Sequence, residues 1–150
     1  MKNKKLVYGV LVVLAILGIG FVVLKQSTAP KVSHGGPVKD YISLIDSLRA
    51  TGVLVEPVGE ISQPFFSVKG FVVKVDGEEV QTFEYLNAAA ADSEVELVSP
   101  DGASAGTSII TWVATPHFYK EERLIVLYVG DDEDLIKVLE TILGSQFAGG

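Results

Sequence analysis

The feature that most constrains this chain is an uninterrupted apolar run near its N-terminus. Residues 6–24, LVYGVLVVLAILGIGFVVL, contain no charged side chain. As a helix, the run would be about 28 Å long at ~1.5 Å per residue, which is close to the thickness of the hydrocarbon core of a bilayer. The alternative is a cleaved signal peptide, but its apolar region is normally only about 7–15 residues long. We therefore predict an uncleaved transmembrane signal-anchor helix at 6–24.

The placement of lysines around this run predicts its orientation. Lys2, Lys4 and Lys5 precede the run, whereas only Lys25 follows it. Positive charge is retained on the cytoplasmic side, so residues 1–5 are expected in the cytoplasm and the rest of the chain outside it. The predicted location is thus the cell membrane, with a single pass through residues 6–24 and an extracytoplasmic C-terminal domain. The sequence has no cysteine, so this domain must be stable without disulfides.

The charge of the remaining chain argues against one class of partner. Residues 26–150 hold eight basic and nineteen acidic side chains and therefore carry a net charge of −11. Nucleic-acid binding depends on basic side chains that neutralise phosphates, so we expect no nucleic-acid partner. The same charge disfavours broad adhesion to an anionic lipid surface, beyond what the anchor provides.

Composition separates a linker from a folded domain. Residues 25–37 are mostly small or polar, with two prolines and two glycines, and are expected to form a flexible tether. His34 lies in this tether, where we expect it to be solvated. Residues 38–150 are numerous enough to form one self-supporting domain.

The first half of the domain is predicted to contain one helix and three strands. Apolar residues recur at helical spacing over 38–50, with Pro37 suited to the first turn. Residues 53–58 contain a proline, which indicates an edge strand. In residues 70–85, two β-rich runs flank Asp76-Gly77, a strong signature of a hairpin with a type I′ turn.

The second half adds two helices and two strands. Asn87 is a plausible N-cap for a helix over 88–98, of which residues 94–98 could alternatively form a strand, and residues 99–108 are turn-forming. Residues 108–114 and 123–129 are the expected strands, the latter central because its apolar run implies cover on both faces. A final helix is expected at 132–143. The fold class is therefore α+β, with a mainly antiparallel sheet, about three helices and the order α-β-β-β-α-β-β-α.

One segment, TPHFYKEERLIVLYVGDDED at 115–134, could hold an active site. The candidate catalytic residues are His117, Tyr119 and Glu122. The structural alternative is that Thr115-Pro116 breaks a strand, that residues 117–119 cover the sheet edge, and that residues 120–123 turn back. None of the nearby serines has the sequence setting of an activated nucleophile.

The acids at the end of that segment are expected to stabilise a helix. They lack the ligand spacing of an EF-hand, and Asp131 or Asp132 can cap the N-terminus of the following helix. The folded part has one histidine and no cysteine, so we predict no metal site and no cofactor.

Three segments carry a resemblance to other proteins: VSPDGASAG, WVATPHFYKEERLIVLYVGDD and LGSQFAG. In these segments the chain resembles a family of uncharacterised bacterial secreted or membrane-anchored small α+β domains with SPDG, WVxxPHFY, VLYVGD and LGxQFAG segments. The resemblance covers mainly the last third of the folded region. It implies a recurring domain held outside a membrane, and it implies no activity.

Two functions from different classes follow from the sequence. The first is a single-pass anchored extracytoplasmic domain that acts as a non-enzymatic binding or accessory module, with an envelope protein as its possible partner. The alternative is an anchored hydrolase in which His117 is the general base and Ser104, Ser108 or Glu122 assists.

Overall fold

The computed structural model describes residues 36–150. The predicted cytoplasmic residues, the predicted anchor at 6–24 and all but the end of the tether lie outside this range. No helix within residues 36–150 has the length and hydropathy that a membrane crossing requires.

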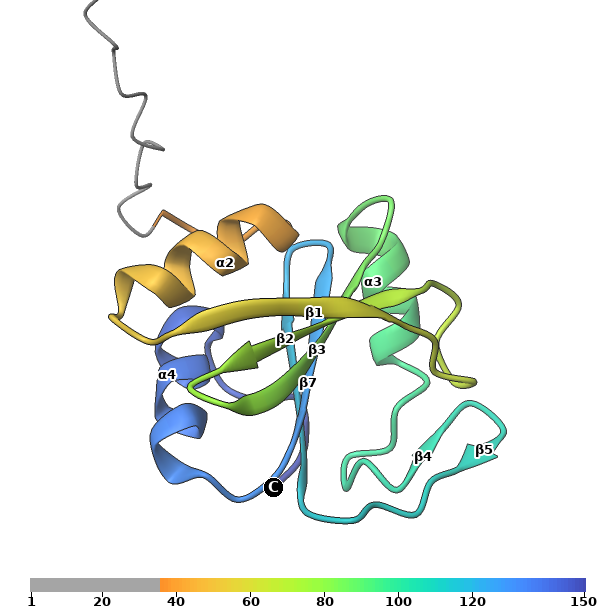
Figure 1. The fold of residues 1–150 in the computed structure, drawn as a ribbon. Coiled ribbons are helices and arrows are strands. Elements are labelled where there is room, and N and C mark those ends of the chain that lie inside the picture. The colour runs from red at the N-terminus through yellow and green to blue at the C-terminus, as the bar shows by residue number, and fades with distance from the viewer. Residues whose placement is uncertain (1–35) are drawn as a thin grey trace, which may run out of the picture. The chain divides into compact units, whose positions relative to one another are not determined.

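Six strands form one antiparallel sheet in the order β1-β2-β3-β7-β6-β8 (Figure 1). Their bounds are Val55–Ile61 (β1), Gly70–Val75 (β2), Glu78–Glu84 (β3), Pro116–Glu121 (β6), Leu124–Val129 (β7) and Ala148–Gly149 (β8). β4 (Ser104–Ala105) and β5 (Ser108–Ile109) pair separately as a short hairpin. β7 lies inside the sheet with its first five residues buried, which confirms the predicted central strand. β1 forms an edge, as its proline predicted.

The three described helices cover both faces of the sheet (Figure 1). They are α2 (Tyr41–Ala50), α3 (Ala88–Val95) and α4 (Glu133–Leu143). Leu44 and Leu48 of α2 and Leu139 of α4 pack on one face, whereas Ala91 of α3 packs on the other. Apart from the short strands, the order is the predicted α-β-β-β-α-β-β-α, and the fold class is α+β.

The Asp76-Gly77 turn confirms the predicted hairpin. Asp76 has φ 50° and Gly77 has φ 95°, as a type I′ turn requires at both central positions. Val75 pairs directly with Glu78, so β2 and β3 are connected by a two-residue loop.

The caps explain where the helices begin. The Asn87 and Asp132 side chains accept hydrogen bonds from the backbone of α3 and α4, which confirms two predicted caps. The predicted start of the first helix near Pro37 was wrong. Asp40 and Ser43 form a reciprocal capping box, so α2 begins at Tyr41, while Val38 enters the core from an extended segment.

The strand predicted at 108–114 was also misplaced. Only Ser108 and Ile109 pair, in β5, and the long strand is β6, which begins at Pro116. Proline is tolerated as the first residue of a strand because its missing N–H need not enter the ladder. Trp112 instead turns toward the core and donates its indole N–H to Gly102 O at 2.8 Å. The predicted corner at 117–119 is therefore part of a strand.

Candidate functional site

His117 is held inside the fold by β6 and its neighbour β7. Its ring is only 6% exposed and stacks on Tyr128, with ring centroids 5.8 Å apart. Nε2 lies 3.1 Å from Gly130 O, and Nδ1 lies 2.8 Å from the side-chain oxygen of Gln146. Both oxygens can only accept, so the ring nitrogen that carries the hydrogen donates to its own partner. Both ring nitrogens thus bind groups of the protein itself.

The contact with Gln146 is one of several that fasten the C-terminus to β6. Phe147 N–H donates to Phe118 O at 2.8 Å, and Gly150 N–H donates to Pro116 O at 3.0 Å. Gly149 N–H donates to Pro100 O at 2.9 Å, so the C-terminal segment also contacts the SPDG turn. Segments that are far apart in the sequence, at 99–102, 116–118 and 146–150, therefore meet around the start of β6.

Tyr119 lies on the same side of β6 as His117 but in the core. The side chain is fully buried among residues of α4 and the sheet, and its hydroxyl has no hydrogen-bond partner among residues 36–150. Burial raises the pKa of Tyr119 from 10.0 to about 12, and the nearby Glu140 carboxylate adds to the rise. Tyr119 therefore has the environment of a core residue that packs as a neutral phenol.

Glu122 is separated from the other two candidates. It lies exposed in the β6–β7 turn with φ 47°, beside a shallow surface hollow that Lys39, Ala88 and Arg123 also line. His117 is five residues away along β6, or about 17 Å at ~3.4 Å per residue. The structure therefore brings the three predicted catalytic candidates to three different environments.

The serines that could assist His117 lie on the other side of the sheet. Ala105, between Ser104 and Ser108, is buried with Phe118, which alternates with His117 along β6. The Ser104 carbonyl accepts from Ser99 N–H at 2.8 Å, so this serine has a turn-forming role. The predicted assistance of His117 by Ser104 or Ser108 has no geometric support.

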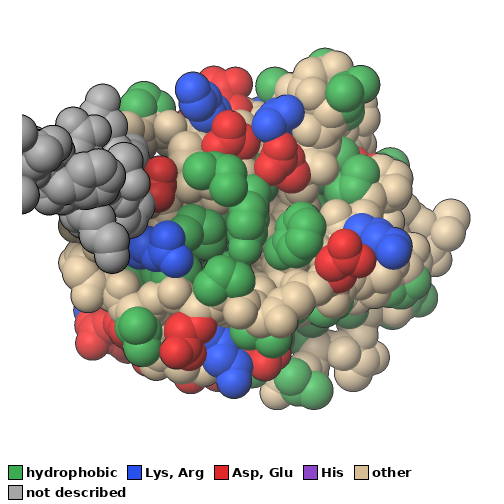
Figure 2. All heavy atoms as spheres, turned by 45° about the horizontal axis from the view of Figure 1, so that its top comes forward, with side chains coloured by type: hydrophobic (Ala, Val, Ile, Leu, Met, Phe, Trp, Pro, Cys, Tyr) green, Lys and Arg blue, Asp and Glu red, His purple; other side chains and the backbone are tan. Residues whose placement is uncertain are grey.

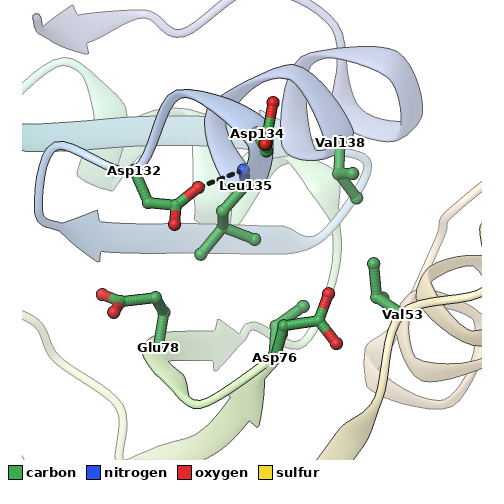
Figure 3. Close-up of a pocket in the computed structure, with 8 residues that line it drawn as sticks. Val53, Asp76, Glu78, Asp132, Asp134, Leu135 and Val138 are labelled. Atoms are coloured by element: carbon green, nitrogen blue, oxygen red, sulfur yellow. Dashed lines mark hydrogen bonds between the residues drawn. The ribbon is translucent and has the colours of Figure 1, made fainter.

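A cleft of about 220 Å³ lies between the β2–β3 turn and the start of α4 (Figure 3). Its lining combines four apolar side chains, Val53, Val75, Leu135 and Val138, with four carboxylates, Asp76, Glu78, Asp132 and Asp134. Figure 3 shows Glu78 and Asp132 facing each other from the hairpin and the helix. The sequence predicted that the acids of 131–134 stabilise the start of the last helix. No local sequence pattern indicated that the hairpin turn would lie opposite them.

Most of these carboxylates already stabilise the fold. Asp76 accepts from Leu54 N–H at 2.7 Å, and Asp132 caps α4 through Leu135 N–H at 2.8 Å. Glu78 accepts from the Tyr128 hydroxyl at 3.2 Å. Burial raises the pKa of Tyr128 and the Glu78 carboxylate adds to the rise, whereas the hydrogen bond from Asp132 N–H to the phenol oxygen opposes it. Within residues 36–150 no group of three or more metal-ligating side chains has the geometry of a metal site.

Two large apolar side chains are almost fully exposed beside the β4–β5 hairpin. Ile109 is 90% exposed and Val113 is 99% exposed. Trp112, between them, packs against Phe65 and Phe118 and holds the segment on the core. Ile109 and Val113 are therefore exposed on a segment that Trp112 attaches to the core.

No known protein family, curated protein or solved structure matches this chain.

Proposed function

We propose that this chain is a single-pass membrane-anchored protein whose extracytoplasmic domain is a non-enzymatic binding or accessory module of the cell envelope. The environment of His117 carries the proposal. This histidine is the strongest catalytic candidate of the domain, and its two nitrogens bind Gly130 and Gln146 inside the fold. It fastens the C-terminal segment to the sheet, a role that needs no substrate.

The sequence supplies the location. The apolar run at 6–24 matches a bilayer in length, and lysines precede it. The domain that follows is large enough to be stable alone, and its strong acidity disfavours nucleic-acid partners. The resemblance to secreted or anchored bacterial domains agrees with this location. The segments that carry it, SPDG, PHFY and QFAG, meet around the start of β6, so their pattern is accounted for by packing.

We assign the partner contact to the outward side chains Ile109 and Val113. Figure 1 places the β4–β5 hairpin at the bottom of the domain, at the end away from α2. The chain leaves the domain toward the tether beside α2, because Ser47 of that helix donates to Gly36 O at 3.1 Å. An anchored domain would therefore present the hairpin to other envelope proteins and away from its own tether.

Photo-crosslinking in intact cells tests this assignment. A photoreactive residue at Ile109 or Val113 should yield a discrete crosslinked protein, whereas the same residue at Leu86, which is 87% exposed, should not. Equal crosslinking from all three positions, or none from Ile109 and Val113, would contradict the assigned contact.

The hydrolase alternative is tested separately. We expect the full chain in phosphatidylcholine vesicles to give no turnover of fluorogenic esters, phosphate esters or peptides that depends on His117. Turnover that disappears in the His117→Gln variant, while the melting temperature stays unchanged, would overturn the non-enzymatic proposal.

A further inference from the structure

Apolar side chains of α2 and the β1–β2 edge form a second exposed surface (Figure 2). We call it the α2 patch; its centre is the contact between Tyr41 and Phe71, and it includes the exposed Ile42 of the same helix and the exposed Pro57 and Val58 of β1, the strand that pairs with β2. Tyr41 and Phe71 stack with ring centroids 5.2 Å apart, and Phe71 is still 41% exposed. Pro57 lies opposite Val73, on the same sheet face as Phe71. Figure 2 shows apolar side chains gathered in the middle of this face, with charged side chains around them.

The α2 patch lies close to the point where the chain leaves the domain. Gly36, the first described residue, accepts the hydrogen bond from Ser47 of α2. Tyr41 is six residues from Ser47 on the same helix, which corresponds to ~9 Å of helix length. The patch and the tether attachment therefore belong to the same end of the domain.

The charges around the α2 patch nearly balance each other. Three basic side chains, Lys39, Lys69 and Arg123, stand with four acids, Asp40, Glu60, Glu84 and Glu122. Arg123 pairs with Glu84 at 2.5 Å and with Asp40 at 3.9 Å, and Lys69 pairs with Glu60 at 3.7 Å. Glu60 lies directly opposite Phe71, so this pairing borders the patch itself. In a domain that is strongly acidic as a whole, the charges at this end nearly cancel.

We propose that the α2 patch rests on the lipid headgroup region of the membrane in which the chain is anchored. This inference rests on the proposed anchor. A tether of a dozen small and polar residues has a root-mean-square length of roughly 20 Å, which is comparable to the size of a domain with a radius of gyration of about 13 Å. The patch is thus held at high effective concentration beside the bilayer, where weak apolar contact is sufficient to orient the domain.

Lipid is favoured over other occupants by this position and by chemistry. Tyrosine and phenylalanine side chains are suited to the interface, where an apolar ring can be buried while polar groups remain hydrated. The nearly balanced rim reduces the repulsion that the rest of the acidic surface would meet at anionic lipids. The orientation also directs Ile109 and Val113 away from the bilayer.

The absence of cysteine from the sequence allows a direct test by single-cysteine labelling. The full chain carrying Ile42→Cys or Val58→Cys is labelled with a fluorophore and reconstituted in phosphatidylcholine vesicles that contain nitroxide-labelled lipid. Ile109→Cys and Val113→Cys are the controls, because these positions carry the same residue types, are even more exposed than Ile42 and Val58, and lie at the other end. Leu14→Cys reports on the anchor.

We expect quenching at positions 42 and 58 to exceed that at 109 and 113 by at least about twofold, as the geometry of an interfacial contact requires. The double variant Tyr41→Ser/Phe71→Ser should abolish the difference, whereas Ile109→Ser/Val113→Ser should leave it intact. Melting temperatures of both variants establish that the domain remains folded.

Three other results would overturn the inference. If Leu14→Cys is quenched but positions 42 and 58 match the controls, the anchor stands and the patch does not meet lipid. If positions 42 and 58 are quenched only by a second nitroxide-labelled copy of the chain, the patch is a self-association surface. If Leu14→Cys is not quenched and the chain does not float with vesicles, the proposed anchor fails together with the inference.

Discussion

At the scale of single residues, His117 shows how a residue type that is common in active sites can serve packing. A histidine between a proline and two aromatic residues is compatible with a small-molecule pocket or with a sheet. The sequence could pose these alternatives, but the partners that distinguish them, Gly130 and Gln146, are 13 and 29 residues away. Such long-range contacts leave no local pattern, so the sequence favoured packing of the ring against aromatic side chains but could not identify its partners.

Replacing His117 by alanine should destabilise the domain. The variant loses two hydrogen bonds and the stacking on Tyr128, and it leaves a cavity, so we expect the free energy of unfolding to fall by roughly 2–4 kcal/mol. Urea denaturation followed by circular dichroism measures this change. His34→Ala, in the predicted tether, is the control and should have no effect. An unchanged midpoint for His117→Ala would contradict the structural role.

The buried tyrosines predict the response to alkaline pH. The pKa of Tyr119 is raised from 10.0 to about 12, and burial also raises that of Tyr85. The folded state binds these protons more tightly than the unfolded chain, so their contribution to stability is complete below pH 10. It is lost as the pH rises toward 12.

Tyrosinate absorbance recorded beside circular dichroism tests this dependence. Ionisation of these tyrosines should coincide with unfolding, and Tyr119→Phe should unfold at higher pH without loss of stability at neutral pH. The reason is that this change removes a buried hydroxyl that has no hydrogen-bond partner among the described residues. Ionisation of Tyr119 near pH 10 in a folded domain would disprove the burial argument.

At the scale of elements, features with local causes were predictable. Asp76-Gly77 specifies its turn through its own backbone preferences, and Asn87 and Asp132 cap the helices that follow them. β6 was not predictable, because Thr115-Pro116 looks like a break, and only pairing with β7 and the C-terminal segment makes residues 116–121 a strand. The two-residue strand β8 depends entirely on that distant partner.

Two glycine-to-alanine substitutions distinguish the need for positive φ in the β2–β3 turn from the general effect of replacing a glycine. Gly77→Ala places a side chain at φ 95°, so we expect a loss of about 1 kcal/mol or more. Gly59→Ala is a matched control, because Gly59 has no positive φ and an added methyl group would meet no atom within 4 Å. Thermal unfolding of both variants measures the difference. Equal melting temperatures would show that the hairpin does not depend on its type I′ turn.

At the scale of the whole molecule, the acidic cleft and the α2 patch emerge only from the assembled fold. The cleft brings Asp76 and Glu78 of the hairpin to Asp132 and Asp134 of α4, more than fifty residues later in the sequence. The patch joins Tyr41 to Phe71 across α2 and β2. Composition predicted an acidic domain, but the distribution of its charge follows from topology. One end has nearly balanced charges around an apolar surface, and Gly36, the first described residue, is hydrogen-bonded to Ser47 of α2 at this end.

The central claim is that residues 6–24 remain in the membrane and hold the domain outside the cytoplasm. The most direct measurement is labelling of single-cysteine variants in intact cells with a membrane-impermeant maleimide. Ser62→Cys, an exposed position of the domain, should be labelled without permeabilisation, whereas Asn3→Cys should be labelled only after it. Labelling of Asn3→Cys in intact cells, or protection of Ser62→Cys until the membrane is opened, would contradict the account.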